Sequence, residues 1–210
     1  MVDSPYAASH KGLRNALGRF QLQAGATDYT DPGSVASLRA RGAKLEMLLT
    51  HHLAAENRYF LDPLRKRDAA GAEHDLAEHE RLEVLQRKMF SMLASLHTSD
   101  EPARGRDFYL LVTEFHASYL QHILHEERVT EPLLFARFTE EEVARFSQDL
   151  VAAVELPVLL ASLEYIVPAQ PVAESRALLA RLREAPFYPQ LINALRAELD
   201  ADALAALLAP

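Results

Sequence analysis

His52-Leu-Ala-Ala-Glu56 and His122-Ile-Leu-His-Glu126 are the two stretches of sequence that decide the fold. Both follow the pattern His-x-x-x-Glu. Four residues make about one helical turn, so each stretch places an imidazole and a carboxylate on one face of a helix. Apolar residues continue each face at helical spacing: Leu45, Leu49 and Phe60 in the first, Leu111, Phe115, Val129 and Leu133 in the second. An unpaired carboxylate on a core-facing stripe is costly, and a metal ion satisfies both groups at once.

The amino-acid composition limits the kinds of protein and of binding site that the chain can form. The chain has 210 residues, 49% apolar and 25% charged, which is typical of one large domain or of one domain with an extension. It has no cysteine, so disulfides and thiolate metal sites are excluded and any metal must have nitrogen and oxygen ligands. The net charge of −8 and the lack of a long basic run argue against nucleic-acid binding.

The sequence favours a cytoplasmic protein with no membrane partner. Its first residues contain no apolar signal region. The most apolar stretch, residues 150–169, is interrupted by Glu155, Pro157 and Glu164, which leaves it too broken to span a membrane.

Helical periodicity runs through most of the chain, and no useful stretch alternates with a period of two. Turn-rich segments, with Gly25, Gly33, Gly71 and Gly105 at or near them, separate the long helices that we expect. These expected helices span residues 8–24, 35–66, 73–97 and 106–137, with breaks at 26–34, 67–72 and 98–105. Four long amphipathic helices with short connections predict an all-α fold, an up-down-up-down four-helix bundle.

The sequence changes character after Phe138. Thr139-Glu-Glu-Glu142 is a capping box that starts another helix. Prolines then divide the remainder into short helical pieces: Pro157, Pro168, Pro171, Pro186 and Pro189. We therefore expect a bundle over residues 1–138 and a C-terminal extension of short helices over residues 139–210, packed on the bundle. A protein partner or a second copy of the chain could bind through this extension, which carries no chemical motif.

Each expected long helix supplies at least one inward-facing metal ligand. The predicted set has four imidazoles and two carboxylates: His10, His52, Glu56, His79, His122 and Glu126. We interpret the remaining histidines as solvated residues, as neighbours of ligands or as core residues: His51, His74, His97, His116 and His125. Tyr59 and Tyr119 read as core aromatics or as hydrogen-bond partners of the ligands, and Lys11 and Arg14 as surface charges.

This ligand count suits two metal ions better than one. Two histidines would bind each ion, and Glu56 and Glu126 would bridge the two, which offsets the repulsion between dications about 3.5–4 Å apart. Open positions would remain for a small diatomic ligand or an oxidant. Imidazole with carboxylate suits iron, manganese or zinc.

The ordered pattern resembles the hemerythrin-like, His-His-Glu cation-binding family. The matching residues are His10 in Ser-His-Lys-Gly-Leu, the two His-x-x-x-Glu stretches, the Glu-His-Glu at 78–80, and Glu127 after Glu126, within about residues 8–137. The resemblance implies a four-helix bundle with a non-haem diiron centre. It also implies a role in oxygen binding, in iron or oxygen sensing, or in handling nitric oxide and reactive oxygen species.

The segment around His79 departs from the oxygen-carrying pattern of that family. A second histidine would lie one turn from His79, where this chain has Asp75 on one side and Glu83 on the other. His74 falls on a different helical face. Fewer neutral nitrogen donors and more anionic oxygen ligands stabilise ferric iron, so we expect a binding or sensing protein and not an oxygen carrier.

Several alternatives stay open. Glu127 can replace Glu126 as a ligand, although Glu126 mirrors Glu56, and Asp75 or Glu83 can join the site. The chain can also be a diiron redox enzyme that handles peroxide, dioxygen or nitric oxide, or a helical interaction protein with a degenerate, empty site.

Overall fold

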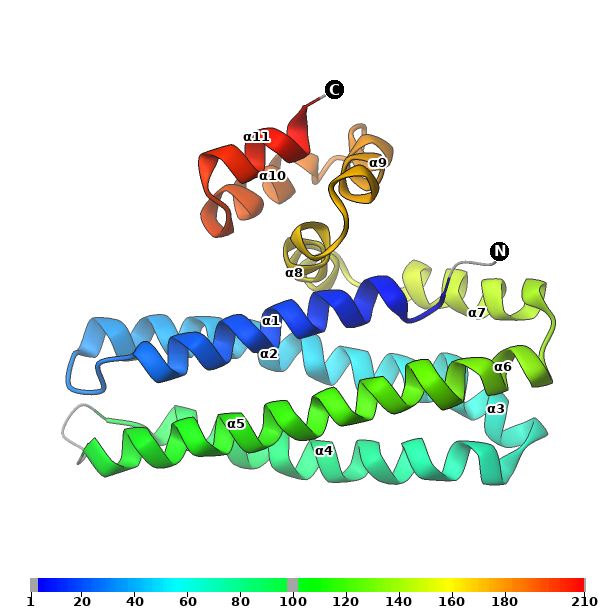
Figure 1. Cartoon of the computed structure of the whole chain (residues 1–210), viewed down its shortest axis with the longest axis horizontal. Helices are drawn as coiled ribbons and strands as arrows, with labels where there is room; N and C mark the ends of the chain where they lie inside the picture. Colours follow the sequence, from blue (N-terminus) through cyan, green and yellow to red (C-terminus); the bar gives the residue numbers. More distant parts are fainter. Residues whose placement is uncertain (1–3, 98–101, 210) are drawn as a thin grey trace.

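The computed structural model describes residues 4–97 and 102–209, and within them every regular element is helical. The all-α class predicted from the sequence is therefore confirmed. The long helices are α1 (Ala7–Ala26), α2 (Pro32–Glu56), α4 (Ala69–Ser95) and α5 (Pro102–His125). They lie side by side, and each runs opposite to the one before it along the chain (Figure 1).

All three predicted breaks differ in extent from those observed. Gly71 and Gly105 lie inside α4 and α5, and Gly33 lies in the first turn of α2. Asp68 alone separates α3 from α4, because its carboxylate accepts a hydrogen bond from the Gly71 N–H and caps the new helix. Of the break expected at 98–105, residues 98–101 lie outside the described residues and 102–105 are helical.

Both His-x-x-x-Glu helices continue through a wide π turn into a short α-helix. Here η1 (Asn57–Leu61) leads into α3 (Asp62–Arg67), and η2 (Glu126–Thr130) leads into α6 (Glu131–Arg137). The N–H groups of Asp62 and Glu131 donate to carbonyl oxygens five residues earlier. A proline follows each, and a proline ring needs room beside the carbonyl four residues earlier, which the wider turn provides. Such turns are frequent at functional sites.

One apolar cluster fills the space between the long helices, and a second contains residues of η1, α3 and α6. The larger contains Phe20, Leu45, Phe90 and Phe115, and the smaller contains Tyr6, Phe60, Leu64 and Leu134 at the end where the π turns lie. Along each long helix, the predicted ligand positions fall between residues of these two clusters. The polar side chains therefore form a layer enclosed by apolar packing on both sides.

Short helices follow Phe138, as the prolines predicted. They are α7 (Glu140–Ala153), α8 (Leu156–Ile166), η3 (Val167–Ala169), α9 (Val172–Leu182), α10 (Tyr188–Glu198) and α11 (Ala201–Leu208). The capping box at Thr139 and Glu142 is present. Figure 1 shows α8 lying across α1, with α9, α10 and α11 stacked beyond it. The division into regions at residue 138 stays a prediction.

Close packing and ion pairs tie these short helices to the long ones. A Cβ atom on Gly12 would lie 2.6 Å from Cγ1 of Ile166, so only glycine lets α8 approach α1 this closely. The Lys44 ammonium lies 2.7 Å from the buried carboxylate of Glu164. Glu198 accepts hydrogen bonds from Arg19 and Arg41.

No single helix in the described ranges is long and apolar enough to cross a membrane. One pair of helices, Glu140–Ala153 with Leu156–Ala169, meets the length and composition requirement together, with a bend of 116° between them.

Candidate metal centre

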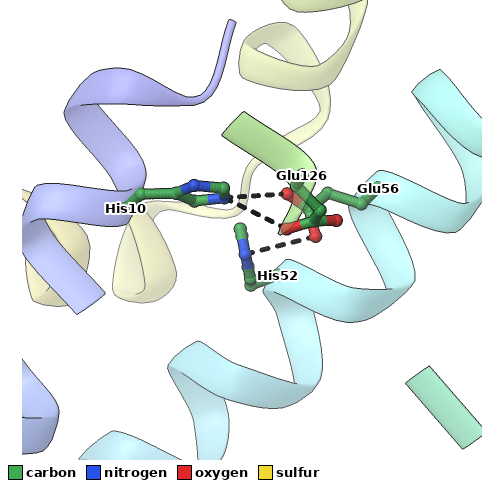
Figure 2. A group of neighbouring side chains, drawn as sticks. All are labelled: His10, His52, Glu56 and Glu126. Carbon is green, nitrogen blue, oxygen red and sulfur yellow. Dashed lines mark hydrogen bonds and ion pairs between the residues drawn. The ribbon is translucent and has the colours of Figure 1, made fainter. Parts of the chain in front are cut away.

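The structure brings all six predicted ligand side chains together. His10 comes from α1, His52 and Glu56 from α2, His79 from α4, and His122 and Glu126 from the end of α5 and the start of η2. Five of the six are at most 2% exposed, and the side chain of His52 is 11% exposed. Figure 2 shows His10 and His52 pointing toward the carboxylates of Glu56 and Glu126. Their assignment as metal ligands stays a prediction.

The six side chains divide into two groups that share both glutamates. One group contains His10 and His52, the other contains His79 and His122, and each includes Glu56 and Glu126. Within a group, one candidate ligand atom from each residue lies within 4.8 Å of all the others. Each pair of histidines thus faces the same two carboxylates, an arrangement that suits two ions with bridging carboxylates.

Two pairs of candidate ligand atoms are hydrogen-bonded to each other: Nε2 of His79 lies 2.9 Å from Nε2 of His122, and Nε2 of His10 lies 3.3 Å from Oε1 of Glu56. Other candidate ligand atoms lie close together without a hydrogen bond. His52 Nε2 lies 3.2 Å from Glu56 Oε2, and His122 Nε2 lies 3.3 Å from Glu126 Oε2. Neither contact has hydrogen-bond geometry. Among the described residues, His52 Nε2, Glu56 Oε2 and both carboxylate oxygens of Glu126 are buried without a hydrogen-bond partner. Buried polar atoms of this kind are costly unless a ligand satisfies them, so the donor set fits a bound metal.

Burial controls the protonation of the histidines in this layer. It holds the pKa of His52 well below its usual range, and lowers the pKa of His79 to about 4 and that of His122 to about 2. Neutral imidazole is the form that binds a metal. His10 differs, because its hydrogen bonds to Glu127 and Glu56 outweigh the effect of burial and raise its pKa.

Burial shifts the pKa values of the two shared glutamates in the opposite direction. Burial raises the pKa of each well above its usual range, and the charge of Glu126 adds to this effect at Glu56. Two carboxylates this close resist ionising together unless a cation compensates them.

Two acceptors outside the six hold histidine rings in place. Nδ1 of His10 lies 3.1 Å from Oε1 of Glu127, and Nδ1 of His79 lies 2.8 Å from Oδ1 of Asn57. At His79 this contact favours the Nδ1–H tautomer, whose Nε2 carries the lone pair that a metal needs, and this Nε2 lies 2.9 Å from Nε2 of His122. At His10 both ring nitrogens face carboxylates, because Nε2 lies 3.3 Å from Oε1 of Glu56. Arg14 donates to both oxygens of Glu127, at 2.7 and 2.9 Å. Our interpretation of Arg14 from the sequence, as a surface charge, did not include its contact with Glu127.

Comparison with known proteins relates the chain to a known family. The family model of the hemerythrin HHE cation-binding domain matches residues 5–134, more than half of the chain. The chain belongs to the hemerythrin HHE cation-binding domain family. This HHE domain is also similar to a zinc finger protein, BRUTUS-like, from Arabidopsis thaliana. The identity is 27% over 152 residues, which make up 71% of this chain but 12% of that protein. No solved structure matches the chain.

The alternative carboxylates of the HHE domain take other places. Glu127 binds Arg14 and His10 and is absent from both groups of candidate ligands. Glu83 is exposed and forms an ion pair with Arg87, 3.6 Å away. Asp75 is buried but accepts a hydrogen bond from the Thr130 hydroxyl, and it also lies outside those two groups.

Two buried tyrosines border the carboxylates of the HHE domain. The hydroxyl groups of Tyr6 and Tyr119 have no hydrogen-bond partner within residues 4–97 and 102–209. Burial raises the pKa of both phenols, and the charges of Glu56 and Glu126 raise each further. Tyr59 is only partly buried and packs under Arg58. Tyr119 is thus the tyrosine of the expected pair that lies near the site.

A cavity of about 250 Å³ reaches the site from one side. His52 and Glu56 form its inner end, and Tyr6 and Phe60 lie beside them. Its outer wall comes from the short C-terminal helices: Leu150, Val151 and Val154 from α7 and the residue after it, and Leu159, Ser162 and Ile166 from α8. Residues of the HHE domain and of the C-terminal helices therefore line the same cavity beside the candidate metal centre.

Proposed function

We propose that this HHE domain binds a carboxylate-bridged pair of iron ions and serves in binding or sensing oxygen, iron or redox state. The sharing of Glu56 and Glu126 by two pairs of histidines carries the proposal. The helices α1, α2, α4 and α5 then form the up-down-up-down four-helix bundle that holds the centre. Iron bound there supplies a one-electron couple at each ion and affinity for small diatomic ligands.

The residues of the chain have defined tasks in this proposal. His10 and His52 would hold one ion, His79 and His122 would hold the other, and Glu56 and Glu126 would serve both. Glu127 and Asn57 orient His10 and His79 through their Nδ1 atoms. The apolar clusters on either side exclude water, which strengthens the electrostatic interactions of the carboxylates.

The cavity beside His52 supports a small, apolar diatomic ligand as the molecule that is bound. Dioxygen and nitric oxide are nearly apolar, and most of the residues that line this cavity are apolar. The outer wall of this cavity comes from α7 and α8. A movement of His52 or Glu56 would therefore change the shape of a cavity that the C-terminal helices also line. This shared cavity supports a sensing role, in which the extension passes the state of the centre to a protein partner or to a second copy.

The position of Asp75 supports sensing over oxygen carriage. Asp75 lies one turn from His79, where the oxygen-carrying pattern has a second histidine. Each group of candidate ligands therefore contains only two imidazoles. Two neutral nitrogen donors for each ion, with two anionic carboxylates, stabilise the ferric state. Exposure to oxygen should therefore end in oxidised iron. Repeated recovery of the reduced spectrum in iron-loaded protein, after air is admitted and removed without a reductant, would contradict this.

Elemental analysis of the purified chain tests the centre itself, with two ions for each chain as the expected result. A metal bound only by the folded state stabilises it by about 2.7 kcal/mol at a hundredfold excess over Kd. Chelation should therefore lower the melting temperature, and His122→Ala should abolish this difference. Identical melting curves for metal-loaded and chelated protein would overturn the proposal.

Filling the cavity tests the route of the ligand. Ser162→Phe places a ring in the cavity wall and should slow nitric oxide binding to the iron-loaded protein without changing its metal content. Ser95→Phe is the matched control, because Ser95 is exposed at the end of α4 and is not among the residues that line the cavity. Equal rates in the two variants would exclude this route. Turnover of peroxide with a reductant would instead favour a redox enzyme.

A further inference from the structure

We propose that His74, Asp75 and His125 form a third metal site, open to solvent and separate from the buried pair, for a divalent first-row transition metal. His74 and Asp75 lie in the second turn of α4, and His125 is the last residue of α5. One nitrogen or oxygen atom from each side chain lies within 4.8 Å of the others. None of the three residues belongs to the two groups around Glu56 and Glu126.

Asp75 is the observation that points to a bound cation. Its side chain is buried, and one carboxylate oxygen, Oδ2, accepts a hydrogen bond from the Thr130 hydroxyl. The other, Oδ1, has no hydrogen-bond partner in the part of the chain that the structure describes. An unsatisfied oxygen on a buried carboxylate is costly, and a metal ion bound at Oδ1 removes this cost.

The two histidines are placed to complete such a site. Nε2 of His125 lies 3.6 Å from Oδ1 of Asp75, too far for a hydrogen bond and close to the separation of two ligands on one ion. The His74 and His125 rings lie with centroids 4.0 Å apart and planes inclined at 44°. Two imidazoles and one carboxylate, with positions left for water, match the ligand set of mononuclear non-haem iron sites and also accept zinc or cobalt.

This site is more exposed to solvent than the buried centre, which affects how an ion binds and exchanges there. His74 is exposed and the side chain of His125 is 30% exposed, whereas His10, His79 and His122 of the buried centre are at most 1% exposed. An ion here exchanges with solvent without passing through the apolar layers. We therefore expect weaker and faster binding than at the buried pair.

Cobalt titration of the full chain tests the site, with visible absorption as the signal. The chain is first loaded with iron and then treated with a mild chelator, which clears exposed sites. The variants are the double substitution His74→Gln with His125→Gln, and the matched control His97→Gln, which removes another exposed histidine. The original chain and the control should bind one equivalent of Co²⁺ that the double variant does not. Equal uptake by all three proteins would overturn the proposal.

Two further measurements locate the ion. His74→Gln alone should weaken Co²⁺ binding at least tenfold, and bound Co²⁺ should broaden the proton signals of the His74 and His125 rings but not those of His97. Broadening at other histidines only would refute the site. His122→Ala, which damages the buried pair, should still bind the outer Co²⁺, so failure of the buried centre and failure of the outer site are distinguishable.

Discussion

The side-chain oxygen of Asn57 lies 2.8 Å from Nδ1 of His79. Asn57 directly follows Glu56, so one turn of chain supplies both a shared carboxylate and the group that orients a histidine from α4. Because Asn57 accepts the Nδ1–H of the ring, Nε2 of His79 stays unprotonated and faces the centre.

We predict that Asn57→Ala lowers metal affinity by about 10- to 100-fold, the range found when an acceptor behind a histidine ligand is removed. Asn57→Asp keeps an acceptor oxygen and should stay close to the original affinity. Competition with a chelator of known affinity gives the measurement. An alanine variant that binds metal as tightly as the original chain would show that this hydrogen bond has no such role.

Glu127 should have the same role for His10. Glu127→Ala leaves Nδ1 of His10 without its acceptor, so we expect the ion held by His10 and His52 to weaken by about 10- to 100-fold. The ion held by His79 and His122 should be less affected. Metal content after mild chelation should then fall from two ions to one. Glu78→Ala is a suitable control, because Glu78 pairs with the exposed Arg81, and equal loss in both variants would contradict the assignment.

Metal binding should release protons. Burial raises the pKa values of Glu56 and Glu126, so the metal-free protein keeps protons on these groups at pH values where a free glutamate is ionised. A raised folded-state pKa gives stability that is present at low pH and is lost as pH rises through it. Metal requires the ionised form, so affinity should rise with pH. Calorimetric titration in buffers of different ionisation enthalpy measures the release, and no release at pH values above the usual pKa of glutamate would contradict the raised pKa values.

The ion pairs of Glu198 should stabilise the C-terminal helices in a pH-dependent way. Burial alone would raise the pKa of Glu198, but Arg41 and Arg19 outweigh it and lower the pKa. The stabilisation is therefore complete above the unfolded pKa, about 4.3, and is lost as pH falls through the folded value. Glu198→Gln should cost about 1 kcal/mol at pH 7, since the arginines are partly exposed. Thermal unfolding should show this difference shrinking toward pH 3, and a constant difference would contradict it.

The spacing of His52, Glu56, His122 and Glu126 was sufficient to predict which side chains converge, because helical periodicity determines the face on which a residue lies. The roles of Asn57 and Glu127 were not predicted, since they depend on which helices face one another. A signal did exist in the sequence: a polar residue directly follows the glutamate in both stretches, and a proline comes a few residues later. The same limit applies to Arg14, whose partner lies 113 residues away in the chain.

The contacts of Asn57 and Glu127 cross between the two halves of the HHE domain. Residues before Asp68 contribute His10, His52 and Glu56, and residues after it contribute His79, His122 and Glu126. The first half supplies the acceptor for a histidine of the second, and the second half returns one to the first. Neither half alone contains a complete centre, so a chain in which only one helical hairpin has formed cannot hold the metal pair. If the six residues bind metal as we propose, metal uptake would require that both hairpins have formed and docked in the correct register.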